Sequence, residues 1–227
     1  MRALALSLIA TALDGALLAL ALGGVTPLLA HPRALALLAV WAASNAVLAS
    51  RRPLAGHAAA AVDRDPALVM LALFVLPLLA APLAAWGERR GVWPVPWRAA
   101  FGWIGVALAA AGLALRIAAM TRLGARFSPR VALQHEHVLE TRGLYAHVRH
   151  PGYLGAWLAA LGGALAFHSA LGLLPVLLMR VAIEARIRRE ERLLASRFGD
   201  AWRAYRARTG ALWPRLGATP PANAPRA

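Results

Sequence analysis

Six runs of apolar residues make up most of this chain, and they restrict its fold more than any other feature. A run of about 20 apolar residues matches the hydrocarbon thickness of a bilayer, where helices and closed barrels satisfy every backbone hydrogen bond. The runs cover about residues 3–22, 34–49, 67–86, 99–120, 152–167 and 170–183. We therefore expect an all-α, polytopic integral membrane protein with about six helical segments.

The last two runs are short, and only His168 and Ser169 separate them. We expect them to form a tight helical hairpin, which returns the chain to the side of the membrane that it left. Beyond the hairpin, the sixth helix continues as a charged cytoplasmic extension. Gly199 is expected to end this helix and Pro214 to end a further short one. We expect residues 217–227, rich in proline and alanine, to be disordered.

The chain is strongly basic. All 25 basic residues are arginine, the net charge is +15, and 17 of the arginines lie at or after Arg116. In a soluble chain this charge would indicate a nucleic-acid partner. Because the sequence is 60% hydrophobic, we expect anionic lipid head groups instead, and no nucleic acid. Cytoplasmic loops carry the excess of basic residues, so we place residues 121–150, both termini and the active site on the cytoplasmic side, as in a bacterial inner membrane.

An acidic residue interrupts the first run. This run lacks a small-residue cleavage site, so we expect a first membrane span and not a removed signal peptide. Asp14 lies in its middle, where a charge costs roughly 2.5–3.5 kcal/mol on insertion scales and should face protein or water. Structural pairing and a functional role both stay open for Asp14.

In the second run, Ser44 and Asn45 are expected to form interhelical hydrogen bonds.

The longest polar interruption lies directly before the fifth run. Residues 135–155 carry four of the seven histidines and end in Arg-His-Pro-Gly-Tyr-Leu-Gly. Pro151 suits the first turn of a helix, where its missing N–H costs nothing. The N-terminus of that helix would offer free N–H groups and partial positive charge to a carboxylate or phosphate. The alternative is a basic loop beside the membrane that binds no ligand.

A second polar group lies one hairpin later, on the charged extension. Arg186, Glu190 and Glu191 are close in sequence, and the hairpin brings them to the same membrane face as residues 135–155. Neighbouring helix positions differ by about 100°, so the two glutamates should have different partners. We expect Glu191 to contact the 135–155 stretch and Glu190 to position Arg186, four residues earlier. The alternative is a solvated helix face.

In their order and spacing, these motifs resemble the isoprenylcysteine carboxyl methyltransferase family and the related membrane phospholipid methyltransferases. The resemblance covers about residues 116–214, and the four N-terminal runs carry no motif of that family. Its parts are His137-Val138-Leu139, Gly143-Leu144-Tyr145, the 149–155 segment, Glu190-Glu191, Phe198-Gly199, Trp202, Tyr205 and Pro214. Arg188 and Arg189 stand where the family has an acidic run, so the identity of the substrate stays open.

The resemblance implies a membrane methyltransferase that uses S-adenosylmethionine and acts on a lipophilic, lipid or prenylated substrate. The acceptor would be the carboxylate of an isoprenylcysteine-like group or an amino head group. The residues implied for the cofactor pocket are His137, Leu139, Gly143, Tyr145, Arg149, His150, Pro151, Tyr153, Gly155, Glu190 and Glu191. The candidate catalytic residues are Arg186, Glu190 and His150. Arg186 is also the candidate to bind a substrate carboxylate or phosphate.

The resemblance also divides the chain into parts. Residues 1–120 would form N-terminal transmembrane helices. Residues 121–216 would form a methyltransferase-like core, which contains the cofactor loop, the helical hairpin and the C-terminal helices. Residues 217–227 would be the disordered tail.

The chemistry of the cofactor suits these side chains. Arg149 or the helix N-terminus would bind its carboxylate, and a glutamate, for which Glu191 is a candidate, its ammonium group. Tyr145 or Tyr153 would face the sulfonium as a cation–π partner. Because a sulfonium methyl group is already activated, the enzyme mainly aligns it with the acceptor, which can supply roughly 7–11 kcal/mol. A carboxylate acceptor needs no base, whereas an amine needs one. The candidate bases are His137, His150 and Glu190.

Glycines recur along the fifth run. Gly152, Gly155, Gly162 and Gly163 would let neighbouring helices approach closely or leave a groove. We expect the lipophilic substrate to enter sideways from the bilayer and S-adenosylmethionine to enter from the cytoplasm. Bulky replacement of Gly162 is then expected to weaken substrate use more than cofactor binding.

Two other functions stay open from the sequence. One is a membrane reductase of the sterol type that uses NADPH, since such enzymes have a similar Arg-His-x-x-Tyr segment. Pro151 and the Glu190-Glu191 pair favour the methyltransferase over it. The other is a non-enzymatic protein whose arginines bind anionic lipid. No metal site is expected, because the chain has no cysteine and its histidines lack a convincing ligand spacing. The oligomeric state is not indicated.

Overall fold

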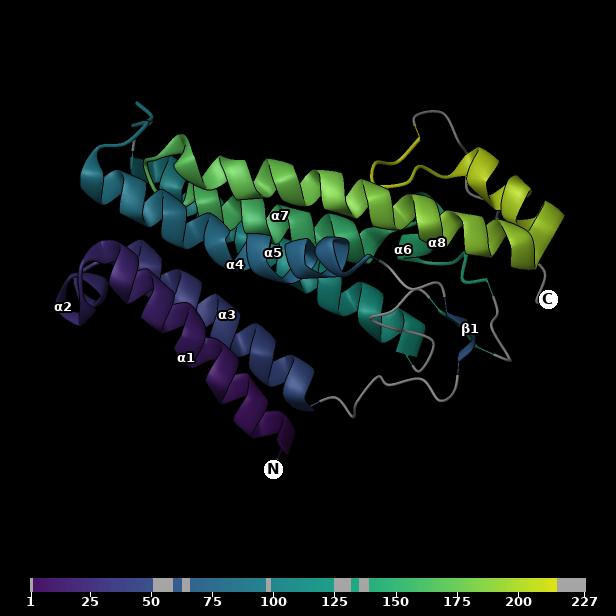
Figure 1. The fold of residues 1–227 in the computed structure, drawn as a ribbon, viewed down its shortest axis with the longest axis horizontal. Coiled ribbons are helices and arrows are strands. Elements are labelled where there is room, and N and C mark those ends of the chain that lie inside the picture. Colours follow the sequence, from purple (N-terminus) through teal and green to yellow (C-terminus); the bar gives the residue numbers. More distant parts are fainter. Residues whose placement is uncertain are drawn as a thin grey trace.

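The computed structural model describes residues 2–50, 59–62, 66–96, 99–124, 132–134 and 139–215. Its longer helices are α1 (Arg2–Leu22), α3 (Pro32–Ser50), α4 (Ala67–Arg90), α5 (Ala99–Leu123), α7 (Pro151–Leu165) and α8 (Leu173–Arg208) (Figure 1). The shorter ones are α2 (Val25–Leu29), α6 (Leu144–His147) and the 3₁₀ turn η2 (Ala170–Gly172). Two short strands, β1 (Ala59–Val62) and β2 (Ala132–Gln134), pair antiparallel. The expected tail 217–227 lies outside the described residues.

Each of the six apolar runs forms a helix, so the prediction of a helical, polytopic membrane protein is confirmed. In the described part of the chain, four helices are long and apolar enough to cross a bilayer: α1, α3, α4 and α5. The predicted hairpin is formed by α7 and α8, joined by η2. Helix α7 has 15 residues and is about 22 Å long, which is shorter than the hydrocarbon core of about 30 Å. Helix α7 is therefore too short for the α7–α8 hairpin to cross the whole hydrocarbon core.

Helices α5 and α7 pack with their backbones in close approach, because small residues line both surfaces. A Cβ atom added to Gly112 of α5 would lie 2.5 Å from the backbone nitrogen of Ala159 on α7. A Cβ atom added to Gly162 of α7 would lie 2.5 Å from the carbonyl oxygen of Gly105 on α5. This contact sets the end of α5 beside the beginning of α7, where the polar residues gather.

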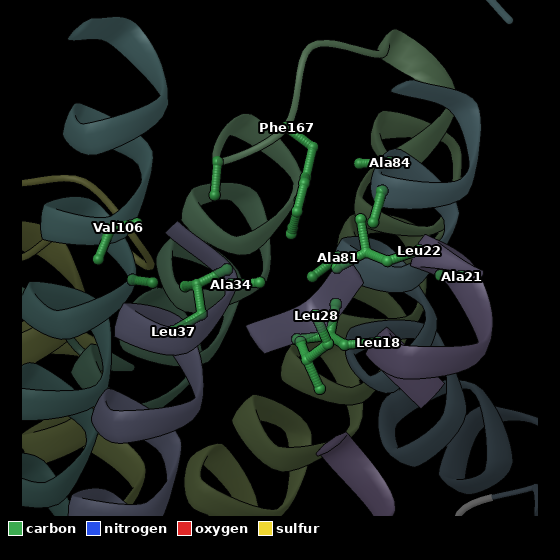
Figure 2. Packing of buried hydrophobic residues seen from close by; sticks show 13 residues of the cluster. Leu18, Ala21, Leu22, Leu28, Ala34, Leu37, Ala81, Ala84, Val106 and Phe167 are labelled. Carbon is green, nitrogen blue, oxygen red and sulfur yellow. The ribbon is translucent and has the colours of Figure 1, made fainter. Parts of the chain in front are cut away.

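Helices α1 and α3 form an antiparallel pair joined through α2, and the pair diverges from the bundle of α4, α5, α7 and α8 (Figure 1). At the α2 end the two groups share an apolar core (Figure 2). Leu18 of α1 and Leu37 of α3 are fully buried there, against Phe167 from the turn after α7. Burial of side chains of this size stabilises the fold by about 1.5–3 kcal/mol each, so this core fixes the pair to the bundle.

A polar cluster of Arg33, Glu88 and His168, here called the Glu88 cluster, reinforces the same end. The Arg33 guanidinium donates to Oε1 of Glu88 at 2.9 Å and lies 3.0 Å from Nε2 of His168. The backbone N–H of His168 donates to Oε2 of Glu88 at 3.0 Å. One carboxylate therefore connects α3, α4 and the turn between α7 and α8.

The C-terminal part of α8 agrees with one boundary prediction and corrects another. Gly199 has a φ of 47° and a ψ of −117°, which interrupts the helix where the sequence indicated. The helix ends at Arg208 and not near Pro214. It ends early because the next segment pairs with the chain before α7: the N–H of Arg149 donates to the carbonyl of Gly210 at 2.9 Å. That tertiary pairing brings the C-terminal segment beside the polar residues.

Candidate active site

A cavity of about 560 Å³ lies among α1, α3, α4, α5, α7 and α8. Its volume is within the range of small-molecule binding sites. The sequence-predicted site residues that line it are Leu139, Tyr145, Arg149, His150, Tyr153, Arg186 and Glu190. Trp41, Leu73 and Phe74 are among the apolar residues that complete the wall. The two motif groups that lie one hairpin apart in sequence therefore face one space.

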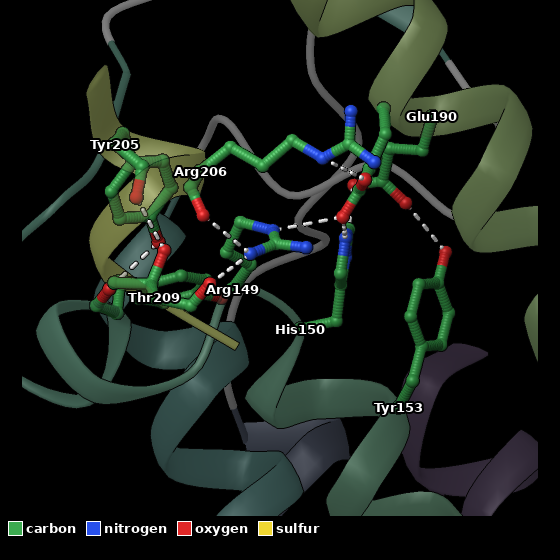
Figure 3. A network of polar contacts seen from close by, with 9 residues as sticks. Arg149, His150, Tyr153, Glu190, Tyr205, Arg206 and Thr209 are labelled. Carbon is green, nitrogen blue, oxygen red and sulfur yellow. Dashed lines mark hydrogen bonds and ion pairs between the residues drawn. The ribbon is translucent and has the colours of Figure 1, made fainter. Parts of the chain in front are cut away.

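The first contact group joins the start of α7 to α8. The Nε of Arg149 donates to Oε1 of Glu191 at 2.8 Å, and Nε2 of His150 lies 3.3 Å from the same oxygen (Figure 3). Arg149 also donates to the carbonyls of Arg206 and Thr209. The expected contact of Glu191 with the 135–155 stretch is thus present. Because several protein acceptors already bind the Arg149 guanidinium, it positions the C-terminal segment.

The electrostatics of this group favour an ionised Glu191. Burial by itself would raise the pKa of the Glu191 carboxyl. Hydrogen bonds from His150 and Arg149, together with their charges, instead lower this pKa to about 2. Glu191 is therefore a carboxylate at neutral pH, and its charge offsets that of the buried Arg149.

The second contact group joins Tyr153 of α7 to two residues of α8. The Tyr153 hydroxyl donates to Oε2 of Glu190 at 2.9 Å and accepts from Nε of Arg186 at 2.5 Å. The Arg186 guanidinium lies 5.8 Å from the centre of the Tyr153 ring. Glu190 thus reaches Arg186 through the tyrosine hydroxyl. The two adjacent glutamates have different partners, as their angular separation on a helix indicates.

Arg116 of α5 lines the cavity and was not among the site residues predicted from the sequence. Its guanidinium donates to the carbonyl of Gly152 at 3.1 Å, and its charge acts on both Tyr153 and Arg186. An arginine inside an otherwise apolar run is costly in a membrane, and this cost is the signal that could have identified it. Arg116 and Arg186 give this part of the cavity a positive potential.

The remaining predicted residues shape the site. The Tyr145 hydroxyl donates to the carbonyl of Ala119 at 3.3 Å, which holds α6 against α5. Pro151 is the first residue of α7, as predicted. Gly143 precedes α6 with a φ of 60°, a backbone conformation that favours glycine. Gly155 packs against the backbone of α5. His137 lies outside the described residues.

Among the described residues, no group of three or more histidine, cysteine, aspartate or glutamate side chains is placed to hold a metal ion. The cavity wall offers three arginines, the carboxylate of Glu190 and the hydroxyl-bearing side chain of Tyr153 beside an apolar space. Such a set can bind a small zwitterion and the anionic end of an amphiphile.

Comparison with known proteins connects this geometry to a family. Residues 103–196 match the model of the isoprenylcysteine carboxyl methyltransferase (ICMT) family. We call this matched stretch, which resembles that family, the ICMT segment. It contains Arg116, Tyr153, Arg186 and Glu190 and most of the hairpin. The ICMT segment excludes α1, α3 and α4, although all three contribute to the cavity.

One relative and one solved structure extend the comparison. The chain is 40% identical over 98 residues to the protein-S-isoprenylcysteine O-methyltransferase of Schizosaccharomyces pombe, which is 42% of this chain and 42% of that protein. The chain thus spans less than half the length of this curated ICMT relative. A solved structure of a eukaryotic intramembrane Ras methyltransferase ICMT matches 79% of this chain and 65% of its own, with a TM-score of 0.54 and 21% identity. At this identity the match shows a shared fold.

Proposed function

We propose that this protein is an integral membrane methyltransferase that transfers a methyl group from S-adenosylmethionine to the carboxylate of an isoprenylcysteine-like lipid. The observation that carries the proposal is the pair of arginines, Arg116 and Arg186, on the wall of a largely apolar cavity within an ICMT segment. Residues 121–216 would form the core that binds the cofactor, and residues 1–120 the membrane helices that complete the cavity. The family match and the named relative favour this activity over an NADPH-dependent reductase or a purely lipid-binding role.

The side chains on the cavity wall suit the cofactor. S-Adenosylmethionine supplies an activated methyl group on a cationic sulfur. Glu190 would bind its ammonium group, since the Glu190 side chain remains 34% exposed. Tyr153 presents its ring to the cavity and would face the cationic centre. Leu139 and Tyr145 would contact the adenosine portion, with His150 beside them.

Other predicted cofactor residues would act indirectly. Arg149 and Glu191 neutralise each other and would hold His150 in place. Pro151, Gly143 and Gly155 would set the path of the backbone around the cofactor. His137 stays a candidate cofactor contact from the sequence.

The two arginines on the cavity wall favour a carboxylate acceptor over an amine. Arg186 and Arg116 can bind a carboxylate through charge-assisted hydrogen bonds, whereas they would repel a protonated amine. The substrate carboxylate oxygen would bond to the methyl carbon as the carbon–sulfur bond breaks, with its electron pair remaining on sulfur. This step needs no base. The arginines therefore act by orienting the nucleophile.

We further propose a bacterial inner-membrane location with the site facing the cytoplasm and anionic lipid beside it. The excess of arginine after residue 116 supports the cytoplasmic orientation. Arg188, Arg192 and Arg197 lie exposed on the charged part of α8, where they would meet acidic head groups.

The test uses the purified full chain in detergent. We expect saturable binding of radiolabelled S-adenosylmethionine and transfer of label to N-acetyl-S-farnesylcysteine as a base-labile methyl ester. Arg186→Ala should abolish this transfer, whereas Arg188→Ala, which removes an exposed arginine from the same helix, should retain it. Saturable binding of NADPH without binding of S-adenosylmethionine would overturn the proposal. A base-stable label on an amino lipid would exclude O-methylation.

A further inference from the structure

A polar patch on the N-terminal helices faces the same cavity as the arginines. The patch consists of Asp14 of α1 and of Ser44 and Asn45 of α3, here called the Asp14 patch, and all three line the cavity. It lies outside the ICMT segment. Its surroundings on these helices are otherwise apolar, and they include Trp41 and Leu48 on the cavity side of α3.

Hydrogen bonds hold two members of the patch, one of them between α3 and α1 and the other within α3. The Nδ2 of Asn45 donates to Oγ1 of Thr11 at 3.1 Å, and the Ser44 hydroxyl donates to the carbonyl of Val40 at 2.8 Å. Thr11 lies three residues before Asp14, on the same face of α1. The patch therefore places three polar side chains on the cavity wall, and hydrogen bonds hold those of Ser44 and Asn45.

Asp14 itself has neither a hydrogen bond nor an ion pair with any other residue that the structure describes. It lies near the centre of the membrane helix Ala5–Leu22, where an acidic side chain is costly and normally has a partner. Asp14 is half-buried and lies on the cavity wall, where a bound ligand could supply the missing partner. The sequence left two roles open for Asp14, structural pairing and function. Among the described residues, Asp14 has no partner for structural pairing.

The cavity thus offers two separate polar regions joined by apolar surface. One is cationic, with Arg116 and Arg186 on α5 and α8. The other accepts hydrogen bonds and lies on α1 and α3. Leu73 and Phe74 of α4 and Leu113 of α5 contribute apolar wall to the same cavity. A ligand that fills this space has an anionic end, an apolar body and a hydrogen-bond donor on that body.

We infer that the Asp14 patch binds a hydroxyl or amino group on the apolar part of the methyl acceptor, and so selects acceptors with a second polar point. This inference rests on the proposed function, because it takes the cavity to be the acceptor site. The hydroxyl and the amino group share one property, because both can donate a hydrogen bond to the Asp14 carboxylate. A hydroxyl donates to either oxygen of a carboxylate, and an ammonium group also pairs with its charge.

The test compares three S-alkylcysteine probes with the same 15-carbon chain: unsubstituted, with a terminal hydroxyl, and with a terminal amine. With the full chain in detergent, the KM of at least one substituted probe should be about tenfold lower than that of the unsubstituted probe, at similar kcat. Asp14→Leu should remove this preference. Asp14→Asn should retain a preference for the hydroxyl and lose one for the amine. Asp200→Asn, which removes an exposed carboxylate from α8, should change nothing.

Equal KM values for the three probes in the unaltered protein would overturn the inference, as would a preference that survives Asp14→Leu. If Asp14→Leu does not fold, Asp14→Asn and Asn45→Leu decide. Loss of an amine preference in Asp14→Asn, or of a hydroxyl preference in Asn45→Leu, supports the inference, and an unchanged preference in both variants overturns it. If neither the probes nor N-acetyl-S-farnesylcysteine is methylated, the proposed function fails. Thermal shifts of the purified protein then decide the patch separately: a larger shift with a substituted probe supports it, and equal shifts overturn it.

Discussion

The side chains of Arg149 and Glu191 form an ion pair across the site, with Nε of Arg149 2.8 Å from Oε1 of Glu191. Their side chains are only 6% and 12% exposed, so water screens the pair weakly. Because Arg149 also binds the carbonyls of Arg206 and Thr209, this one contact connects the start of α7, the middle of α8 and the C-terminal segment. Its loss should affect all three.

Replacement of Glu191 should therefore destabilise the protein more than replacement of its neighbour. Glu191→Gln leaves the buried Arg149 without its counter-charge, and we expect a loss of about 3–5 kcal/mol in the free energy of unfolding. Glu190→Gln, the matched control, should change stability by less than about 1 kcal/mol because Glu190 is more exposed, yet weaken cofactor binding. Thermal unfolding in detergent and S-adenosylmethionine titration measure the two effects. Equal stability of the two variants would contradict this division.

The same pair predicts how stability depends on pH. The Glu191 pKa is lowered from 4.5 to about 2 in the folded protein, so its contribution is fully present above about pH 5. That contribution should be lost as the pH falls from 4.5 toward 2, because the unfolded chain takes up the proton first. Thermal unfolding measured from pH 7 down to pH 3 should show this decline. In Glu191→Gln the decline over that window should be smaller, and an identical profile would show that other carboxylates cause it.

Tyr153→Phe tests the link between Arg186 and Glu190. The substitution keeps the ring and removes the hydroxyl that contacts both residues. A hydrogen bond to a charged group contributes roughly 1.5–3 kcal/mol, so the KM for a carboxylate acceptor should rise about tenfold or more. Trp157→Phe, a change to another aromatic residue one turn along α7, serves as the control and should leave this KM unaltered. An unchanged KM in Tyr153→Phe would mean that Arg186 is held in place by other contacts.

Two adjacent glycines of α7 should respond differently to bulky substitution. From the sequence, Gly162 was the expected groove residue, but the structure places it against the backbone of α5. Gly162→Leu should therefore separate α5 from α7 and weaken cofactor and substrate binding together. Gly163 lines the cavity, and its added Cβ would lie at an ordinary 3.4 Å from Ala81. Gly163→Leu should raise the acceptor KM while S-adenosylmethionine affinity stays within about twofold, the pattern first expected of Gly162.

The membrane orientation can be tested with reporter fusions. If both termini are cytoplasmic, a fusion after Gly91, at the end of α4, and one after Gly217 should give opposite signals. Helices α1, α3 and α4 are long and apolar enough for three crossings before Gly91, and α5 for a fourth that returns the chain. The expected result is the same whether or not the α7–α8 hairpin reaches the far side. Matching signals would remove this arrangement.

Much of the fold could be predicted because the length of an apolar run in the sequence directly indicates a membrane helix. The predicted 34–49 run became α3, Pro32–Ser50, and the 99–120 run became α5, Ala99–Leu123. The end of α8 could not be predicted in this way. Proline marks where a helix must stop, whereas Thr209 leaves the helix because the following backbone pairs with Val148. Such pairing between backbone groups has no sequence signature.

The site shows the same limit. Spacing placed Glu191 against the 135–155 stretch, and its contacts with Arg149 and His150 are as expected. The sequence suggested a cofactor carboxylate for Arg149, since it could not reveal the carbonyl acceptors of Arg206 and Thr209. Arg116 was missed because it lies in the 99–120 run, which was interpreted only as a membrane helix on the basis of its many apolar residues.

The position of the Glu88 cluster has a mechanical consequence for the α1–α3 pair. Arg33, Glu88 and His168 fix the pair to the bundle at the α2 end, and the Leu18 and Leu37 core adds to this attachment. A helix of 20 residues is about 30 Å long, so a tilt of about 10° around a fixed end displaces the opposite end by about 5 Å. Small rotations about the α2 end would therefore be amplified along α1 and α3, and they would change the width of the cavity that both helices line.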